Sequence, residues 1–166
     1  MPRILDRKLK HHVFQYVFQS LLAALLIFSV LLILDVFQQT AIIASLGAST
    51  FIVFAAPRSH SATPRALLGG YLVGAAAGIL IHTVFCSHLG QPEEWTVLHA
   101  VAGALSVGLS ILVMTLTDTE HPPASGVALA FVLNEWDPAA ILVVIGSVGL
   151  LALVKIFLGR KLLDLV

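Results

Sequence analysis

The chain of 166 residues is 58% hydrophobic and only 11% charged, and its mean hydropathy is +0.99. Soluble domains are about 45–50% apolar and about 25% charged, and a soluble core of this size could not bury so much apolar surface. Nine basic and nine acidic residues leave no net charge, which argues against a nucleic-acid partner. The composition therefore predicts an integral membrane protein, with a single transmembrane domain over residues 1–166 and lipid around it.

Six apolar runs follow one another along the chain. They are Val17–Leu34, Thr40–Ala56, Ala66–Ser87, Thr96–Thr117, Pro122–Leu133 and Pro138–Leu158. The first run is long for a signal peptide and lacks a small-residue cleavage site, so we expect an uncleaved span. A helix needs about twenty residues to cross the hydrocarbon core. The second run is therefore marginal, and the fifth run is too short to cross as a complete helix.

The distribution of basic residues predicts six crossings with both termini in the cytoplasm. If all six segments cross, every Lys and Arg falls on the inner side, and the outer loops carry only acidic charges. The two short segments then come second in each half, as in transporters built from a 3+3 inverted repeat. We expect an all-α bundle of about six membrane segments, with segments two and five interrupted or short. The expected location is the bacterial inner (plasma) membrane.

The most informative stretch begins the fifth segment and consists of His121, Pro122, Pro123, Ala124, Ser125 and Gly126. Proline is favoured in the first turn of a helix, so a helix is expected to start here. The free N–H groups of the residues after the prolines would carry the positive end of the helix dipole, which suits an anion. His121 adds a donor whose charge changes near neutral pH. The alternative is a proline-capped helix start at the membrane surface.

A second polar stretch lies in the middle of the second segment and contains Gly47, Ala48, Ser49 and Thr50. Small and hydroxylated residues can break a helix and offer hydrogen bonds to a solute, or they can allow close helix packing. We expect the two stretches to face each other and form a substrate site. Asp118 and Glu120, which precede His121, are candidates for proton or ion coupling. A solvated turn is the alternative for these two carboxylates.

Glycines recur every four residues in the third segment, at Gly70, Gly74 and Gly78. This face lets a neighbouring helix approach closely, within the chain or between copies, and we expect a homo-oligomer through such spans. A similar small face in the fourth segment consists of Ala100, Ala104 and Gly108. The sequence contains no GxSxG, HExxH, P-loop or CxxC motif, so we expect no enzyme activity, no cofactor and no metal.

These residues resemble the HPP family of integral membrane proteins, named for the motif that appears here as His121-Pro122-Pro123. A second similar block runs from Pro57 to Arg65 and continues to Gly69-Gly70. The resemblance covers residues 40 to 133. The chain departs from the family pattern at Ser125-Gly126 and at Tyr71, where the family often has histidine. Family members are commonly described with four spans, whereas the charges here predict six. Plant plastid and cyanobacterial members look like nitrite transporters, so the resemblance implies nitrite or a similar anion.

The absence of basic residues from the central segments limits the kind of solute. No Lys or Arg lies between Lys10 and Arg58 or between Arg65 and Lys155. A transported anion would meet only helix ends and His121, which suits a weakly held monovalent ion. We therefore expect transport of a small inorganic anion such as nitrite. The alternatives are a pore for a neutral solute or a protonated weak acid, and a membrane scaffold or subunit that transports nothing.

Overall fold

A computed structural model describes residues 9–31, 40–86, 97–133 and 138–166, and helices account for most of this part of the chain. The helices are α1 (Leu9–Leu31), α2 (Thr40–Ala55), α3 (Pro64–Ile81), α4 (Val97–Thr117), α5 (Pro122–Leu133) and α6 (Pro138–Leu158). A 3₁₀ turn, η1 (His60–Ala62), precedes α3, and a π-helical turn, η2 (His82–Cys86), extends it. The predicted segments are confirmed to within a few residues, except that α1 begins well before Val17. The end of that first predicted segment, 32–34, lies outside the described residues.

Helix lengths divide the bundle into four long members and two short ones. The helices α1, α3, α4 and α6 are long and apolar enough to cross a membrane. The 16 residues of α2 and the 12 of α5 rise about 24 and 18 Å at 1.5 Å per residue, less than the core of about 30 Å. Large apolar side chains remain exposed on the outer helices, including Phe14 on α1 and Phe157 on α6, as expected of surfaces that face lipid.

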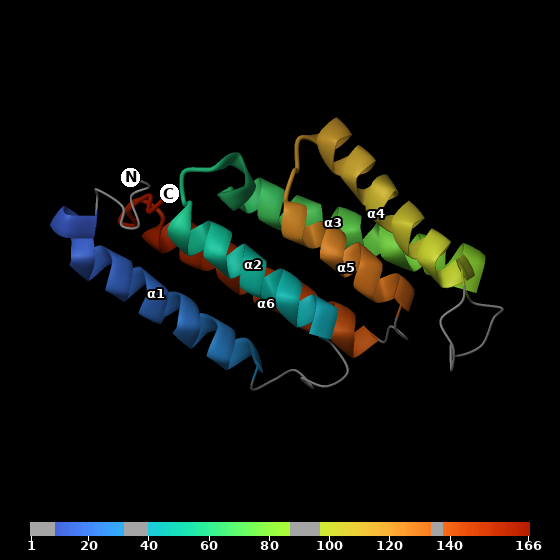
Figure 1. The fold of residues 1–166 in the computed structure, drawn as a ribbon, viewed down its shortest axis with the longest axis horizontal. Coiled ribbons are helices and arrows are strands. Elements are labelled where there is room, and N and C mark those ends of the chain that lie inside the picture. Colours follow the sequence, from blue (N-terminus) through green and yellow to red (C-terminus); the bar gives the residue numbers. More distant parts are fainter. Residues whose placement is uncertain (1–8, 32–39, 87–96, 134–137) are drawn as a thin grey trace, which may run out of the picture.

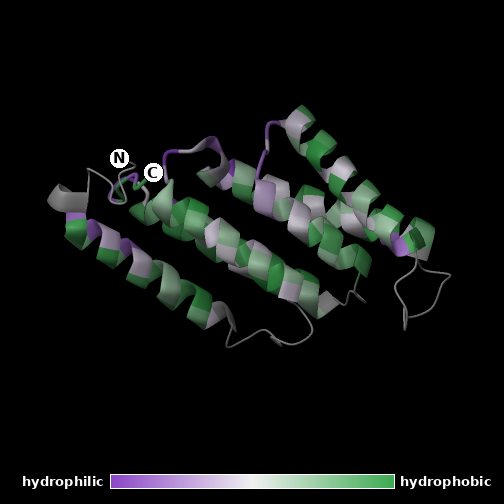
Figure 2. Cartoon of the chain, viewed as in Figure 1, coloured by the Kyte–Doolittle hydropathy of each residue, from purple (hydrophilic) through white to green (hydrophobic). Residues whose placement is uncertain are grey.

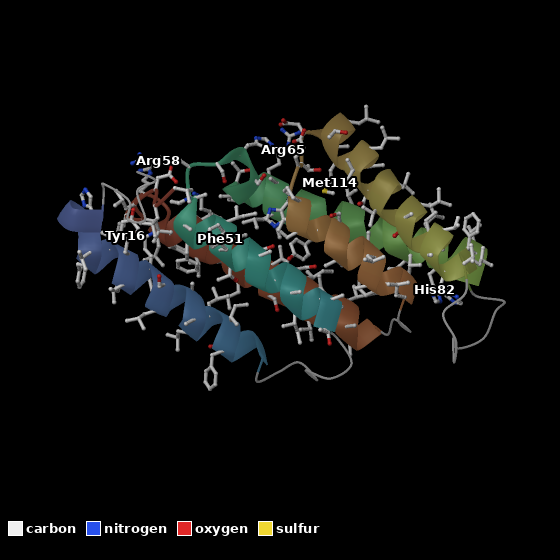
Figure 3. All side chains as sticks on the ribbon, in the orientation of Figure 1. Tyr16, Phe51, Arg58, Arg65, His82 and Met114 are labelled. Atoms are coloured by element: carbon white, nitrogen blue, oxygen red, sulfur yellow. The ribbon has the colours of Figure 1, made fainter. Side chains whose placement is uncertain are left out.

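The helices run along a common direction and alternate in sense (Figure 1). The turns before α3 and α5 lie at the same end as the end of α6, and both turns are hydrophilic (Figure 2). We call this the basic end, because the Lys and Arg side chains that the structure describes belong to it: Arg58, Arg65, Lys155, Arg160 and Lys161. Figure 3 shows Arg58 and Arg65 there, with His82 at the opposite end.

The chain can be divided into two halves, α1–α3 and α4–α6, whose helices pack against one another in corresponding pairs. In each half the first helix packs on the second, α1 on α2 and α4 on α5. Each second helix also packs on the third helix of the other half, α2 on α6 and α5 on α3. The halves meet where α2 contacts α5 and α3 contacts α6. This pattern is the one expected of an inverted repeat, although α3 and α4 also pack extensively, with no equally extensive contact between α6 and α1.

The short helix α5 lies along the glycine face of α3. A β-carbon added to Gly74 would meet the carbonyl oxygen of Ala124, and one added to Gly78 would meet that of Ala128. The glycine face is therefore covered by a helix of the same chain. The small face expected on α4, with Ala100, Ala104 and Gly108, is exposed, so the described part of the chain does not cover it. The buried face of α4 consists instead of His99, Ala102, Gly103, Ser106, Ser110 and Met114.

The two short helices are continuous, so the expected local break in the second segment is not found. The hydroxyls of Ser45 and Thr50 in α2 donate to carbonyl oxygens four residues earlier, over 2.9 and 2.8 Å, and the Ser49 hydroxyl oxygen lies 3.0 Å from the Ser45 carbonyl oxygen. Such bonds satisfy a hydroxyl inside an unbroken helix. Of the two expected forms for segments two and five, the structure has the short one.

Candidate functional site

The site begins where α4 ends and the chain turns back toward the bundle. Asp118 has a φ of 56°, and the Thr119 N–H donates to the Met114 carbonyl over 3.0 Å. This is a Schellman ending, in which the left-handed position usually holds glycine, and aspartate is among the few other residues that tolerate it. The turn sends residues 119–121 down along the first turns of α3.

His121 lies inside the helix bundle and not at its surface. Its β-carbon is next to Gly70, which is six residues after Pro64, the first residue of α3. At 1.5 Å per residue, His121 is recessed about 9 Å from the start of α3. The side chain has no exposed surface. The motif therefore places an imidazole inside the bundle near the start of the shortest helix.

The backbone at the start of α5 offers fewer free donors than the sequence suggested. Pro122 and Pro123 have no N–H group, and the Ala124 N–H donates to the His121 carbonyl oxygen over 2.9 Å. The expectation of a free N–H at Ala124 is wrong, because the first turn closes tightly on His121. Binding at this helix start therefore depends mainly on side chains.

The imidazole of His121 joins three parts of the fold through hydrogen bonds. Its Nδ1 is 2.7 Å from the carbonyl oxygen of Ser61 in η1, and its Nε2 is 2.7 Å from Oγ of Ser49 in α2. Oγ of Ser49 is also 2.7 Å from the hydroxyl of Tyr71 in α3. The rings of Tyr71 and His121 are 5.5 Å apart between centroids. Tyr71, Ser49 and His121 form a buried polar chain, which we call the histidine chain.

Hydrogen-bonding rules give the histidine chain a direction. The Ser61 carbonyl can only accept, so Nδ1 of His121 carries a hydrogen. In the neutral imidazole Nε2 is then an acceptor, and the Ser49 hydroxyl donates to it. Because Ser49 has one hydrogen, the Tyr71 hydroxyl must donate to Ser49. Burial removes water from this chain and favours the neutral ring at rest.

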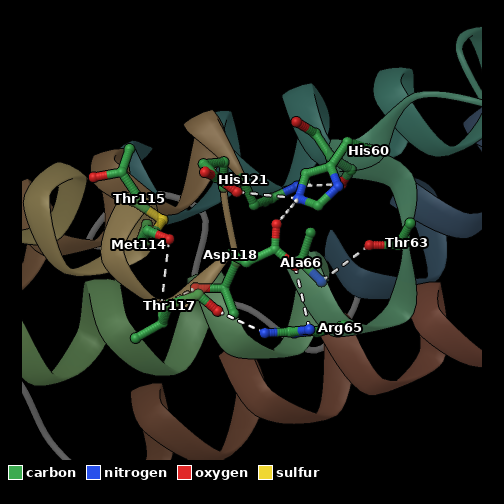
Figure 4. Close-up of polar contacts among 12 residues, drawn as sticks. His60, Thr63, Arg65, Ala66, Met114, Thr115, Thr117, Asp118 and His121 are labelled. Carbon is green, nitrogen blue, oxygen red and sulfur yellow. Dashed lines mark hydrogen bonds and ion pairs between the residues drawn. The ribbon is translucent and has the colours of Figure 1, made fainter.

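A cluster of charged groups lies at the basic end, close to His121 (Figure 4). His60 Nε2 lies 3.0 Å from Glu120 and 3.7 Å from Asp118, and Arg65 pairs with Asp118 at 3.2 Å. Arg65 also donates to the Thr117 carbonyl over 2.8 Å. All four side chains are more than a third exposed. Asp118 and Glu120 therefore belong to a solvated turn, and Arg65 already occupies a position where a cation would bind Asp118.

A groove of about 310 Å³ borders the histidine chain on the side of α4. It is lined by Ile111, Met114, Thr115, Glu120, His121, Pro122 and Ser125. Its walls are mainly apolar, with a few polar groups, as in most small-molecule sites. Glu120 belongs both to the groove and to the charged cluster, so the groove adjoins solvent at the basic end.

The structure brings together some of the predicted site residues and separates others. Ser49 and His121 are hydrogen-bonded, and His121, Pro122 and Ser125 line the groove. Gly126 packs against the side chain of Ser45. The hydroxyl of Thr50 is buried and bonded within α2. In the same helix Ala48 is exposed and Gly47 half-buried, so neither contributes a group to the histidine chain.

Sequence reasoning did not place Tyr71 in the site. A usable signal was present, because Tyr71 follows Gly69-Gly70 at a position where the resemblance leads one to expect histidine. The carbonyl of Ser61 was also missed. No sequence pattern marks a backbone acceptor in a connection between helices.

Comparison with known proteins agrees with the helical membrane architecture. The chain matches the family described as HPP, transmembrane region, over residues 8–161. It belongs to the HPP transmembrane family. Integral membrane character follows from this membership and from the apolar helices. In this HPP family protein, the His121-Pro122-Pro123 motif places the His121 side chain inside the bundle.

Two transmembrane proteins of Dictyostelium discoideum are similar to this HPP chain. One is 35% identical over 97 residues, which are 58% of this chain and 32% of the relative. The other is 36% identical over 93 residues, which are 56% of this chain and 28% of the relative. The aligned part thus spans about a third of each relative's length. No solved structure matches the chain.

Proposed function

We propose that this HPP family protein moves a small monovalent anion, with nitrite as the first candidate, across the membrane through the groove beside His121. The observation that carries the proposal is the position of His121. This residue is fully buried, is recessed about 9 Å along α3, and is among the residues that line a groove of about 310 Å³, which also includes the partly exposed Glu120. A polar group held at such a place in a membrane bundle is a candidate for contact with a solute.

The chemistry of the groove supports a weakly held ion. Apolar walls from Ile111, Met114 and Pro122 surround the polar groups. The Lys and Arg side chains that the structure describes are confined to the basic end. A multivalent anion would lose much of its hydration here without a fixed positive charge in exchange. A monovalent ion loses less and can leave again.

A second candidate solute is a neutral molecule or the protonated form of a weak acid. The apolar walls of the groove favour it, because a neutral solute needs no charged partner. The two candidates differ in net charge movement. Transport of the free anion alone responds to membrane potential, whereas passage of a neutral solute does not.

We also propose that the basic end faces the cytoplasm, with both termini on that side, in the inner (plasma) membrane of a bacterium. The Lys and Arg residues at that end support this orientation. Self-association is a further proposal. Because α5 covers the glycine face of α3, another copy would have to use other small residues, such as Gly108 or Gly146, beside which there is open space.

The test is nitrite uptake by proteoliposomes that contain the purified full chain, with empty liposomes as the baseline. Thr115→Trp places a large ring in the groove, and we expect it to bring uptake close to the baseline. The matched control is Leu116→Trp, because Leu116 is the next residue and is 76% exposed on the outside of α4. His121→Ala should also reduce uptake in protein that keeps its helical circular dichroism.

Equal uptake by the two tryptophan variants would remove the groove from the pathway. Wild-type uptake at the baseline for nitrite, other monovalent anions and small neutral solutes would reject transport and leave a membrane scaffold or subunit.

A further inference from the structure

We infer that His121 also binds the proton that accompanies the solute, and that the Ser49 hydroxyl serves both charge states of the imidazole by turning its O–H bond. This inference rests on the proposed transport function and names the coupling ion of that site. It is carried by the position of the Ser49 oxygen, which lies within hydrogen-bond distance of His121, Tyr71 and the Ser45 carbonyl together.

Ser49 satisfies its partners in either state without moving its oxygen. Beside a neutral ring it accepts from Tyr71 and donates to Nε2 of His121 over 2.7 Å. When Nε2 gains a proton, the imidazolium donates to the same oxygen. The Ser49 hydrogen can then turn to the Ser45 carbonyl, 3.0 Å away. Both states leave the hydroxyl with one donated and two or fewer accepted bonds, which is within its capacity.

Nδ1 of His121 keeps its partner throughout. It donates to the Ser61 carbonyl over 2.7 Å in the neutral ring and in the imidazolium. Protonation therefore changes one hydrogen position in the buried chain and breaks no contact between helices. Without the Ser45 carbonyl as an alternative acceptor for the Ser49 hydrogen, one charge state of His121 would leave a buried polar group unpaired. An unpaired polar group is costly in a site without water.

The groups around His121 explain why a proton would bind together with an anion. The groups that face it from α2 and α3 are the hydroxyls of Ser49 and Tyr71, and α4 contributes the uncharged Met114 and Thr115 to the groove beside it. The charged groups nearby lie at the exposed mouth: His60, Arg65, Asp118 and Glu120. Arg65 is engaged with Asp118.

Among the described residues, none that lines the groove therefore offers a fixed positive charge to an anion that enters alone. A proton on His121 would supply that charge. The transfer of the resulting ion pair out of water costs less free energy than the transfer of either ion alone. The step is balanced, because the conjugate acid HA and neutral His121 give A⁻ and the imidazolium. On the other side the proton returns to the anion or to water. One proton then moves with each anion, and no net charge crosses.

The first measurement follows proton and nitrite movement together. Proteoliposomes contain a trapped pH-sensitive dye, their membrane potential is clamped with potassium and valinomycin, and an inward nitrite gradient is applied. After subtraction of empty liposomes, we expect one proton to enter per nitrite ion, with a rate that does not change with the clamped potential. His121→Gln keeps hydrogen-bonding groups but cannot take up a proton, and it should abolish the protein-dependent proton entry.

Matched variants distinguish the role of the histidine chain from that of the exposed charged residues at the basic end. Ser49→Ala removes the switching hydroxyl and should weaken coupling, whereas Ser29→Ala, which removes a hydroxyl bonded only within exposed α1, should not. Asp118→Asn changes a charge at the exposed end of the bundle, outside the lining of the groove, and should preserve the one-to-one ratio. Nitrite uptake that carries net charge, or proton entry that persists unchanged in His121→Gln, would overturn the inference and leave transport intact.

A second measurement does not depend on transport. Nitrogen NMR of the ¹⁵N-imidazole-labelled full chain, compared with His121→Gln to assign the signal, reports the protonation of His121 directly. We expect the Nδ1–H tautomer at high pH and the doubly protonated ring on acidification in the presence of nitrite. A ring that stays neutral across the range in which histidines ordinarily titrate, about pH 5 to 8, would overturn the proton site even if no solute were transported. Absence of uptake with a titrating His121 would instead reject only the proposed function.

Discussion

Gly70 and His121 are in such close contact that a β-carbon on Gly70 would lie 2.7 Å from the β-carbon of His121. The same added atom would lie 3.0 Å from the Thr119 carbonyl oxygen. Both neighbours belong to the segment that enters α5, so neither can yield as the tip of a flexible side chain could. This contact sets the depth at which the imidazole lies.

Gly70→Ala is therefore expected to destabilise the bundle by about 1–3 kcal/mol through overpacking. Thermal unfolding of the purified protein in detergent measures the change. Gly108→Ala is the matched control, because both glycines are helical and an added β-carbon at Gly108 meets nothing within 4 Å. Gly108→Ala should leave the free energy of unfolding unchanged, or raise it by up to about 1 kcal/mol because alanine has the higher helix propensity. Equal effects at both positions would show that the Gly70 contact does not limit packing.

Ser49→Ala should destabilise the protein by about 1–3 kcal/mol, because it leaves buried polar atoms of Tyr71 and His121 without their shared partner. The proximity of the Ser49 hydroxyl to the Ser45 carbonyl within α2 is not the cause. Ser29 makes a comparable bond to the Leu25 carbonyl at 2.9 Å on an exposed face, so Ser29→Ala should change the unfolding temperature little. A similar loss in the two variants would argue that the histidine chain contributes nothing to stability.

Replacement of Asp118 tests whether backbone or charge governs the end of α4. Its φ of 56° suits asparagine and glycine, whereas alanine in the left-handed region costs about 1–2 kcal/mol. We expect Asp118→Ala to destabilise by about that amount and Asp118→Asn to be nearly neutral, because an exposed ion pair with Arg65 contributes little. If the asparagine and alanine variants lose stability equally, the ion pair is the dominant contribution.

Gln19 holds the C-terminal tail against α1 and α2. Its side chain is 2% exposed. It donates to the carbonyls of Phe54 and Leu163 and accepts from the Leu163 N–H over 2.8 Å. Gln19→Leu should leave these backbone groups unpaired and speed hydrogen exchange at the amide of Leu163. Ser20→Ala, at an exposed neighbour with a local bond, should leave that exchange unchanged. Unaltered exchange in Gln19→Leu would mean that the tail is held by other contacts.

The sequence was most informative where local chemistry decides the outcome. Apolar runs and prolines placed five of the six helices to within a few residues, and the start of α5 at Pro122 was predicted correctly because proline fixes a first helical turn. Partners across helices were harder to predict. The face opposite Gly70 and Gly74 could have belonged to another copy, and only the fold shows that it belongs to α5.

The site was predicted in part for the same reason. His121 and Ser49 were named because polar groups in apolar segments are conspicuous, yet the tyrosine between them was not. The contact of Tyr71 with Ser49 becomes evident only in the fold, where α3 lies beside α5 and the Tyr71 hydroxyl reaches Ser49 of α2. The outward position of Ala48 depends on the rotation of α2 about its own axis, which a helix with small residues on several faces does not reveal in its sequence.

The paired prolines at the start of α5 have a consequence for selectivity. Where an ion is recognised by main-chain amides, a point substitution cannot easily change which ion is preferred. In the proposed site two amides are missing and the next is occupied by His121, so we expect ion discrimination to depend on a few replaceable side chains of the groove, such as Ser125 and Thr115. If the proposed transport function holds, we expect single substitutions at these side chains to change which ion is preferred without a change of fold.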